Sequence, residues 1–201
     1  MVSDAGTERF WWNSLEGLEM DLNTAGHPAY NVVEVADFIL KAVRPLSNFA
    51  RLLDLGCGIG RLTSEIAGRV PAETEIVGVD ISEKLIDEAK RWPAHNTLYR
   101  VNDGRTLPER TGMFDGAWSV AMFQHIPYEA MMGYVAEVCD HLRPGATFVF
   151  TVARGDEDMF LNHQLSDDGM ITLISKLGGR FATVDVHQDE RNGWTWIEAT
   201  K

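Results

Sequence analysis

An apolar strand that runs directly into a glycine-rich turn constrains this fold more than any other segment. Residues 51–55 (RLLDL) predict a buried strand, and Gly56, Gly58 and Gly60 follow at alternate positions before a helical pattern begins. Glycine lets the backbone turn tightly and lets another group approach it closely. A helix N-terminus adds free N–H groups and partial positive charge. We therefore expect this turn to hold a ligand that is partly charged.

The segments around this turn alternate between strand and helix. Apolar runs predict seven strands, at 51–55, 75–80, 97–101, 113–120, 146–152, 180–188 and 193–201. Helical patterns follow Gly60, begin near Ser82, and run from Pro127 to the RPG at 143–145. Such alternation predicts an α/β fold with a mostly parallel sheet and helices on both faces. The last two strands are joined by a short turn and predict a hairpin, so the last strand is antiparallel.

The N-terminal part predicts a helical cap over residues 1–48, which joins the domain at 49–201 in one compact unit. Residues 32–43 form an amphipathic pattern, and Asn31 with Glu34 matches a capping box. Trp12 points about 100° away from the apolar stripe of residues 10–22. Trp12 and Tyr30 are therefore candidates to contact a substrate, with packing inside the cap as the alternative.

Charge and composition exclude several classes of protein. The net charge is −12, and no cluster of Lys and Arg is present, which disfavours a nucleic-acid partner. No apolar run approaches about 20 residues, so we expect no membrane span. The first ten residues lack the pattern of a signal peptide, and we expect a cytoplasmic protein. Cys57 and Cys139 are expected to remain thiols, as in a reducing compartment.

The spacing of the glycines distinguishes two kinds of ligand. A dinucleotide fold requires G-x-G-x-x-G, and here Arg61 occupies the position of the third glycine. This disfavours a nicotinamide-dependent oxidoreductase. Asp54 lies inside the preceding strand, where a carboxylate suits a ligand with an ammonium group better than a pyrophosphate.

These segments together resemble the class I S-adenosylmethionine-dependent methyltransferases. The stretch LLDLGCGIGR resembles the first motif of that family, and VGVDIS, YRVNDGRTLP, FDGAWSVAMFQHI and HLRPGATFVF follow in the order of the later motifs. The resemblance covers residues 51–201. It implies a Rossmann-like fold, S-adenosylmethionine as the cofactor, and direct transfer of a methyl group to an acceptor.

The resemblance also assigns residues to the cofactor. Asp80 matches the acidic residue that binds both ribose hydroxyls, as a carboxylate can accept two hydrogen bonds; a charge at a helix N-terminus is the alternative. Asp103 matches the residue that contacts the adenine amino group, with a plain Asp-Gly turn as the alternative. The residues implied for cofactor binding are Asp54, Gly56, Cys57, Gly58, Gly60, Asp80, Ile81, Asn102, Asp103, Gly104, Ser119 and Gln124.

The acceptor is expected to be a small molecule. Relatives that methylate amino groups of DNA bases have DPPY or NPPY where this chain has DGAWSV. Neither Cys57 nor Cys139 is placed as the nucleophile that cytosine C5 methylation uses. His125 follows the fourth strand and is the candidate general base, since imidazole titrates near neutrality. Packing within its loop is the alternative for His125.

Three further interpretations remain open. Asp156, Glu157, Asp158 and His163 could hold a divalent ion or recognise an amine, but such a run is more often a solvated loop, and we predict no metal. Trp194 and Trp196 face the same side of their strand and are expected to pack under a helix. The chain could also bind S-adenosylmethionine without transferring its methyl group, as a partner or regulatory protein.

Overall fold

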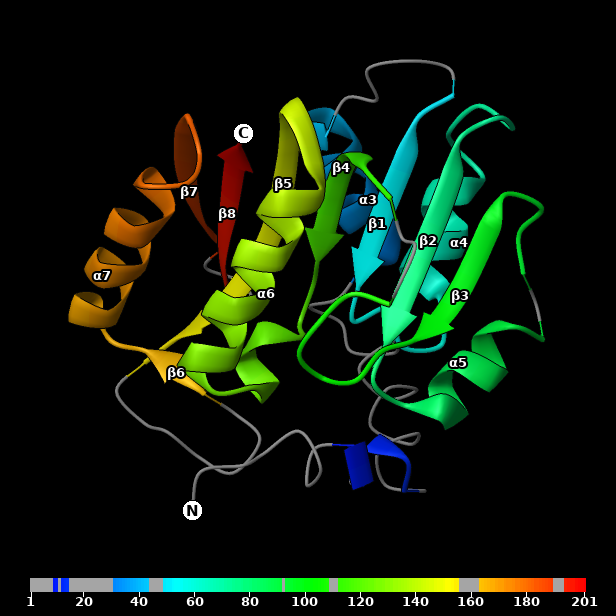
Figure 1. Cartoon of the computed structure of the whole chain (residues 1–201), viewed down its shortest axis with the longest axis horizontal. Coiled ribbons are helices and arrows are strands. Elements are labelled where there is room, and N and C mark those ends of the chain that lie inside the picture. The colour runs from blue at the N-terminus through cyan, green and yellow to red at the C-terminus, as the bar shows by residue number, and fades with distance from the viewer. Residues whose placement is uncertain are drawn as a thin grey trace.

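One twisted sheet organises the molecule. The computed structural model describes residues 9–10, 12–14, 31–43, 49–91, 93–108, 112–155, 163–189 and 194–201. In these residues the strands are β1 Arg51–Leu55, β2 Glu75–Asp80, β3 Thr97–Val101, β4 Phe114–Ser119, β5 Leu142–Arg154, β6 Gln164–Leu165, β7 Thr183–Asp189 and β8 Trp194–Thr200. Their order in the sheet is β3-β2-β1-β4-β5-β8-β7, with β6 beside β5 (Figure 1). The predicted α/β, Rossmann-like sheet is confirmed.

The last strand is the antiparallel one. β8 pairs antiparallel with both β5 and β7, whereas β1, β2, β3 and β4 run parallel. The sheet differs from the prediction by an eighth strand, the two-residue β6, which pairs parallel with the end of β5. A strand of two residues has too little alternation to be recognised in a sequence.

Helices cover both faces of this sheet. They are α3 Val32–Val43, α4 Arg61–Ala67, α5 Glu83–Ala89, the short 3-10 helix η1 Phe123–His125, α6 Tyr128–His141 and α7 Asp167–Gly178. In Figure 1, α6 and α7 lie in front of the sheet and α3 lies behind it. The apolar residues of α6 and α7 share one core cluster, and those of α3 and α4 share a second.

Local sequence signals explain most element bounds. The bounds of β1, β2 and β3 are the predicted ones. The Asn31 side chain accepts from the backbone N–H of Val33 at 3.1 Å and donates to Glu34 at 3.1 Å, so the predicted cap is present. One prediction was wrong: the RPG at 143–145 does not close α6 but lies in β5, because the helix already ends at His141 and the chain becomes extended there.

The helix α3 belongs to the layer that covers the sheet. Its residues Val35, Ala36 and Ile39 pack in one cluster with Trp196 of β8, and Trp194 packs against the same cluster. The ring centres of Phe38 and Trp196 lie 4.6 Å apart. The prediction that both tryptophans pack under a helix is therefore confirmed.

The described residues contain neither a membrane-spanning helix nor a disulfide. No helix within them is long and apolar enough to cross a membrane. Cys57 and Cys139 both lie in these ranges, and they form no disulfide, as predicted.

Candidate functional site

A cleft opens where the carboxyl ends of β1, β2 and β4 meet. Parallel strands in open α/β sheets place ligands at this edge. Figure 1 shows the described N-terminal residues, in blue, below the same edge. The residues that line the cleft are Trp12, Gly56, Gly58, Asp80, Ile81, Leu85, Asn102, Gly104, Val120, Ala121, Met122, Gln124, His125, Ile126 and Tyr134.

The glycine turn is held by backbone hydrogen bonds. The N–H groups of Gly56 and Cys57 both donate to the carbonyl of Val79 at the end of β2, at 2.8 and 3.0 Å. Gly56 has φ +77°, and a Cβ at this position would stand 2.7 Å from Cβ of Met122. A side chain there would be strained and would fill the floor of the cleft, so only glycine keeps it open.

Asp80 ends β2 with its carboxylate at the cleft. One oxygen accepts the N–H of Gly58 at 3.0 Å, and the other accepts the N–H of Ser82 at 2.9 Å. A carboxylate offers about four lone-pair sites. A carboxylate that accepts these backbone bonds can also accept bonds from hydroxyl groups, and its position at the cleft fits a vicinal diol.

Asp54 lies under the turn and is not among the residues that line the cleft. Its side chain is 2 % exposed and accepts a hydrogen bond from the Thr63 hydroxyl at 2.6 Å. Burial raises the pKa of Asp54 from 3.8 to about 7, and the charge of Asp80 adds to the effect. At this pKa the carboxyl group is partly protonated at neutral pH, and an approaching cation would favour its ionised form.

Asn102, and not Asp103, faces the cleft. The Asp103 carboxylate is exposed and accepts the N–H groups of Arg105 and Thr106 at 2.8 and 2.7 Å. Partial burial acts to raise the pKa of Asp103, but these backbone hydrogen bonds outweigh it and lower the pKa. The Asp103 carboxylate thus caps a turn and does not line the cleft, and its contact with adenine stays a prediction. The Asn102 amide instead donates to the buried Tyr134 hydroxyl at 2.8 Å.

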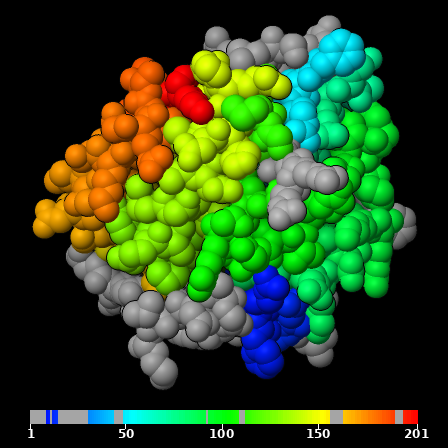
Figure 2. Space-filling model, in the orientation of Figure 1, coloured from blue at the N-terminus to red at the C-terminus, as the bar shows by residue number. Residues whose placement is uncertain are grey.

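The N-terminal segment docks on the rim of the cleft. The Arg9 guanidinium donates to the Asn102 carbonyl at 2.6 Å. The Ser82 hydroxyl lies 3.0 Å from both the Trp12 carbonyl oxygen and Oδ1 of Asn13. In Figure 2 the described N-terminal residues, in blue, lie against the green residues of the domain. Trp12 is among the residues that line the cleft, and its contact with a substrate stays a prediction.

His125 lies at the same place, at the end of η1. Its imidazole contacts the Trp12 ring edge-on, with ring centres 5.3 Å apart. Nε2 of Gln124 lies 3.4 Å from Nε2 of His125. Oε1 of Gln124 is buried without a hydrogen-bond partner in the described part of the chain, so it can accept one from a ligand.

The structure brings most of the predicted residues together. Those that line the cleft are Trp12, Gly56, Gly58, Asp80, Ile81, Asn102, Gly104, Gln124 and His125. The predicted residues outside the lining are Asp54, Cys57, Gly60, Ser119 and Asp103. Tyr30 lies outside the described residues, as do Asp156, Glu157 and Asp158. Within the described ranges, no group of three or more His, Cys, Asp or Glu is arranged to hold a metal ion.

Sequence reasoning missed Leu85 and Tyr134 in the lining. Tyr134 lies in the middle of α6, where its apolar spacing predicts only a core position. Leu85 is likewise a buried position of α5. No local pattern distinguishes either residue from an ordinary core residue, because its contact with the cleft depends on how the helix crosses the sheet.

The sequence and the fold both match known methyltransferases. Residues 52–145 match the family described as "Methyltransferase domain". The chain is 30% identical over 146 residues to the trans-aconitate 2-methyltransferase of Deinococcus radiodurans, covering 72% of this chain and 54% of that protein. It is 29% identical over 156 residues to the malonyl-[acyl-carrier protein] O-methyltransferase of Enterobacter lignolyticus, covering 71% and 60%. The chain thus spans about half the length of the curated relatives it matches.

The fold is that of the magnesium protoporphyrin IX methyltransferase of Synechocystis, solved with bound SAH. The two structures share a TM-score of 0.73 at 18% identity, over 98% of this chain and 100% of that one. Residues 52–145 thus match a methyltransferase domain, and the motifs and the sheet order are similar to those of the class I S-adenosylmethionine-dependent methyltransferases.

Proposed function

We propose that this protein transfers a methyl group from S-adenosylmethionine to a small-molecule acceptor. The observation that supports this most strongly is the Asp80 carboxylate, which faces one cleft together with the open glycine turn, Asn102 and His125. The Synechocystis neighbour, which shares the fold, was crystallised with SAH and, in a second structure, with SAM. The residues of the cleft fit the same cofactor here.

Each part of the proposed cofactor would meet a residue of suitable chemistry. Asp80 would accept hydrogen bonds from the ribose hydroxyls, and Asn102 and Gly104 would border the adenine. Asp54 lies under the turn and outside the cleft lining, so it would act at a distance: the positive charge of the ligand's ammonium group would favour the ionised carboxylate and offset the burial that raises its pKa. When bound, the cofactor supplies an activated methyl group, so no metal is needed.

The protein would then contribute alignment and a base. Holding two reactants in line can lower a barrier by roughly 7–11 kcal/mol. His125 borders the cleft beside Trp12, and we propose that it takes the proton of the acceptor. The docked residues Arg9, Trp12 and Asn13 would cover the site and exclude water, as part of the predicted cap over residues 1–48.

Calorimetric titration with S-adenosylmethionine, S-adenosylhomocysteine and NADH tests the cofactor. Micromolar binding of the first two, without binding of NADH, is the expected result. Binding of NADH alone would overturn the proposal and the interpretation of Arg61. Release of S-adenosylhomocysteine in the presence of an acceptor then separates an enzyme from a partner protein that only binds the cofactor.

A further inference from the structure

A second cavity lies on the other side of η1 from the cofactor cleft. Its volume is about 350 Å³. A cavity of about 150 Å³ in another protein admits benzene, so this one has room for a substituted ring. The two cavities share Ile126, and the N–H of His163 donates to the Gln124 carbonyl, which ties the chain before β6 to η1. The second cavity is therefore bordered by the residue that follows His125 in the chain.

The wall of this second cavity combines apolar side chains with four polar ones, those of Tyr128, Glu129, His163 and Gln164. Phe123, Met131 and Val152 are fully buried residues that line it. The Tyr128 hydroxyl also lines it and is buried without a hydrogen-bond partner in the described residues. Such a hydroxyl can donate one hydrogen bond to a ligand and accept others, and it needs no charge on that ligand.

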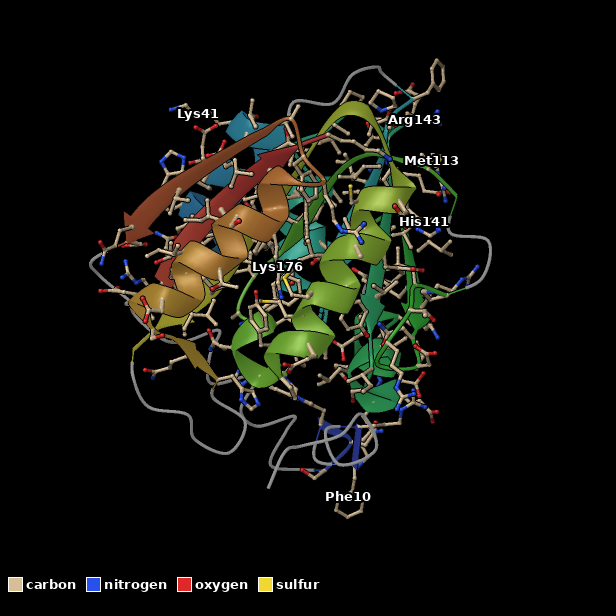
Figure 3. The ribbon with its side chains drawn as sticks, turned by 60° about the vertical axis from the view of Figure 1, so that its left-hand side comes forward. Phe10, Lys41, Met113, His141, Arg143 and Lys176 are labelled. Atoms are coloured by element: carbon tan, nitrogen blue, oxygen red, sulfur yellow. The ribbon has the colours of Figure 1, made fainter. Side chains whose placement is uncertain are left out.

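No Lys or Arg is among the described residues that line either cavity. Arg154, at the end of β5, is paired with Asp167. Lys176 of α7 lies on the side that faces α6, with its ammonium 4.9 Å from the centre of the Tyr128 ring (Figure 3). In the sequence, residues 156–162 (DEDMFLN), which lie outside the described ranges, contain three acids and no Lys or Arg, and Arg9 is the one Lys or Arg in residues 1–30.

The described lining of the two cavities therefore offers no Lys or Arg to hold an anionic acceptor. Carboxylate and phosphate groups are held in proteins chiefly by Arg and Lys. A cationic acceptor would lack a buried carboxylate. Glu129 is the one acid among the described lining residues of the second cavity, and it is exposed. An ammonium inside the cavity would lose water without gaining a buried carboxylate.

We propose that the methyl acceptor is an uncharged, largely apolar molecule with one hydroxyl, such as a substituted phenol. Its apolar body occupies the second cavity, and its hydroxyl reaches His125. The hydroxyl oxygen forms the new bond to the methyl carbon, its proton passes to the imidazole of His125, and the electron pair of the broken carbon–sulfur bond stays on sulfur. This inference rests on the proposed function and adds the class of acceptor.

A matched series of acceptors tests the charge directly. We would use 4-propylphenol, 4-propylbenzoate and 4-propylbenzylamine, which share a body and differ in charge. Binding to the protein saturated with S-adenosylhomocysteine is measured by calorimetry, and methyl transfer by release of S-adenosylhomocysteine from S-adenosylmethionine. We expect the phenol to bind about tenfold more tightly than the other two and to be methylated. Equal or tighter binding of the benzoate or the amine overturns the inference.

A substitution that adds a charge to the wall of the second cavity is the second test. Leu165→Lys places an ammonium beside the second cavity, and Leu165→Met is the control of similar volume. We expect the lysine variant to bind the benzoate about tenfold more tightly than the control does. No gain shows that the acceptor does not lie against β6. If S-adenosylhomocysteine binds and no member of the series does, the inference fails while the cofactor proposal stands. If the cofactor does not bind, the proposed function itself fails.

Discussion

The two sides of the cleft are built in different ways. On the cofactor side, backbone groups fix the geometry: the N–H groups of Gly56 and Cys57 bond to Val79, and that of Gly58 bonds to Asp80. On the proposed acceptor side, side chains from η1, α6 and β6, both apolar and polar, form the wall. A backbone-built site requires a few residue types at fixed spacing, whereas a side-chain wall can be made from many sequences. Sequence motifs therefore predict the cofactor side of the cleft far better than the acceptor side.

The largest effect is expected on the acceptor side. His125→Gln should slow turnover about a hundredfold, since a general base contributes roughly 10²–10⁴ in rate. Cofactor affinity should not change, because the glycine turn and Asp80 remain. Turnover and calorimetry on the same preparation separate the two, and His95→Gln, at an exposed position, is the control. Normal turnover at every pH would remove His125 from the role of base.

A substitution in the glycine turn should weaken cofactor binding. Gly56→Val forces a branched side chain into φ +77° and against Met122. Left-handed backbone costs such a residue roughly 1–2 kcal/mol, so the turn should leave the geometry that binds the cofactor. Restoring that geometry would cost the same free energy, and cofactor affinity should fall by up to about thirtyfold. Gly133→Ala is the control, because a Cβ there meets nothing within 4 Å. Unchanged affinity in Gly56→Val would mean that the ligand does not approach this turn.

Asp80 and Asp103 give a sharper comparison within the cofactor side. Asp80→Asn should weaken cofactor binding about tenfold, because hydrogen bonds to a charged group are worth about 1.5–3 kcal/mol. Asp103→Asn should leave binding unchanged, since its carboxylate is used by the turn to Thr106. Titration calorimetry of both variants measures this. An equal loss in the two would show that Asp103 reaches the adenine after all.

The smallest effect concerns the pH dependence of cofactor binding. Asp54 has a pKa of about 7 in the free protein, and an approaching ammonium group should lower it. Binding then releases a proton, so affinity should rise about fivefold from pH 6 to pH 8. Asp54→Asn should show a flatter profile over the same range. The same rise in the variant would assign the proton to another group.

The pKa of Asp54 also affects folding. Since its folded-state pKa lies above the ordinary value of 3.8, its contribution to stability is complete below about pH 4 and is lost as the pH rises through 7. The free energy of unfolding of the native chain should therefore decrease from pH 5 to pH 8 more than that of Asp54→Asn. Urea unfolding of both at the two pH values measures the difference.

The sequence by itself determined the sheet, the glycine turn and Asp80. Runs such as 51–55 and 75–80 have the length and composition of buried strands, and glycines at alternate positions fix a turn that other residues cannot adopt. These are local rules, so they can be recognised without the fold. The two-residue β6 and the start of β5 at Leu142 could not be, because they depend on pairing with a neighbouring strand.

Only the tertiary structure decided which polar residues face the cleft. It gave that place to Asn102 and put the adjacent Asp103 in a turn, since the direction of each side chain depends on where β3 ends against β2. It also brought Trp12 to His125 across more than a hundred residues, and Tyr134 to Asn102. Contacts between distant segments follow from how helices cross the sheet, and no spacing within one segment encodes that crossing.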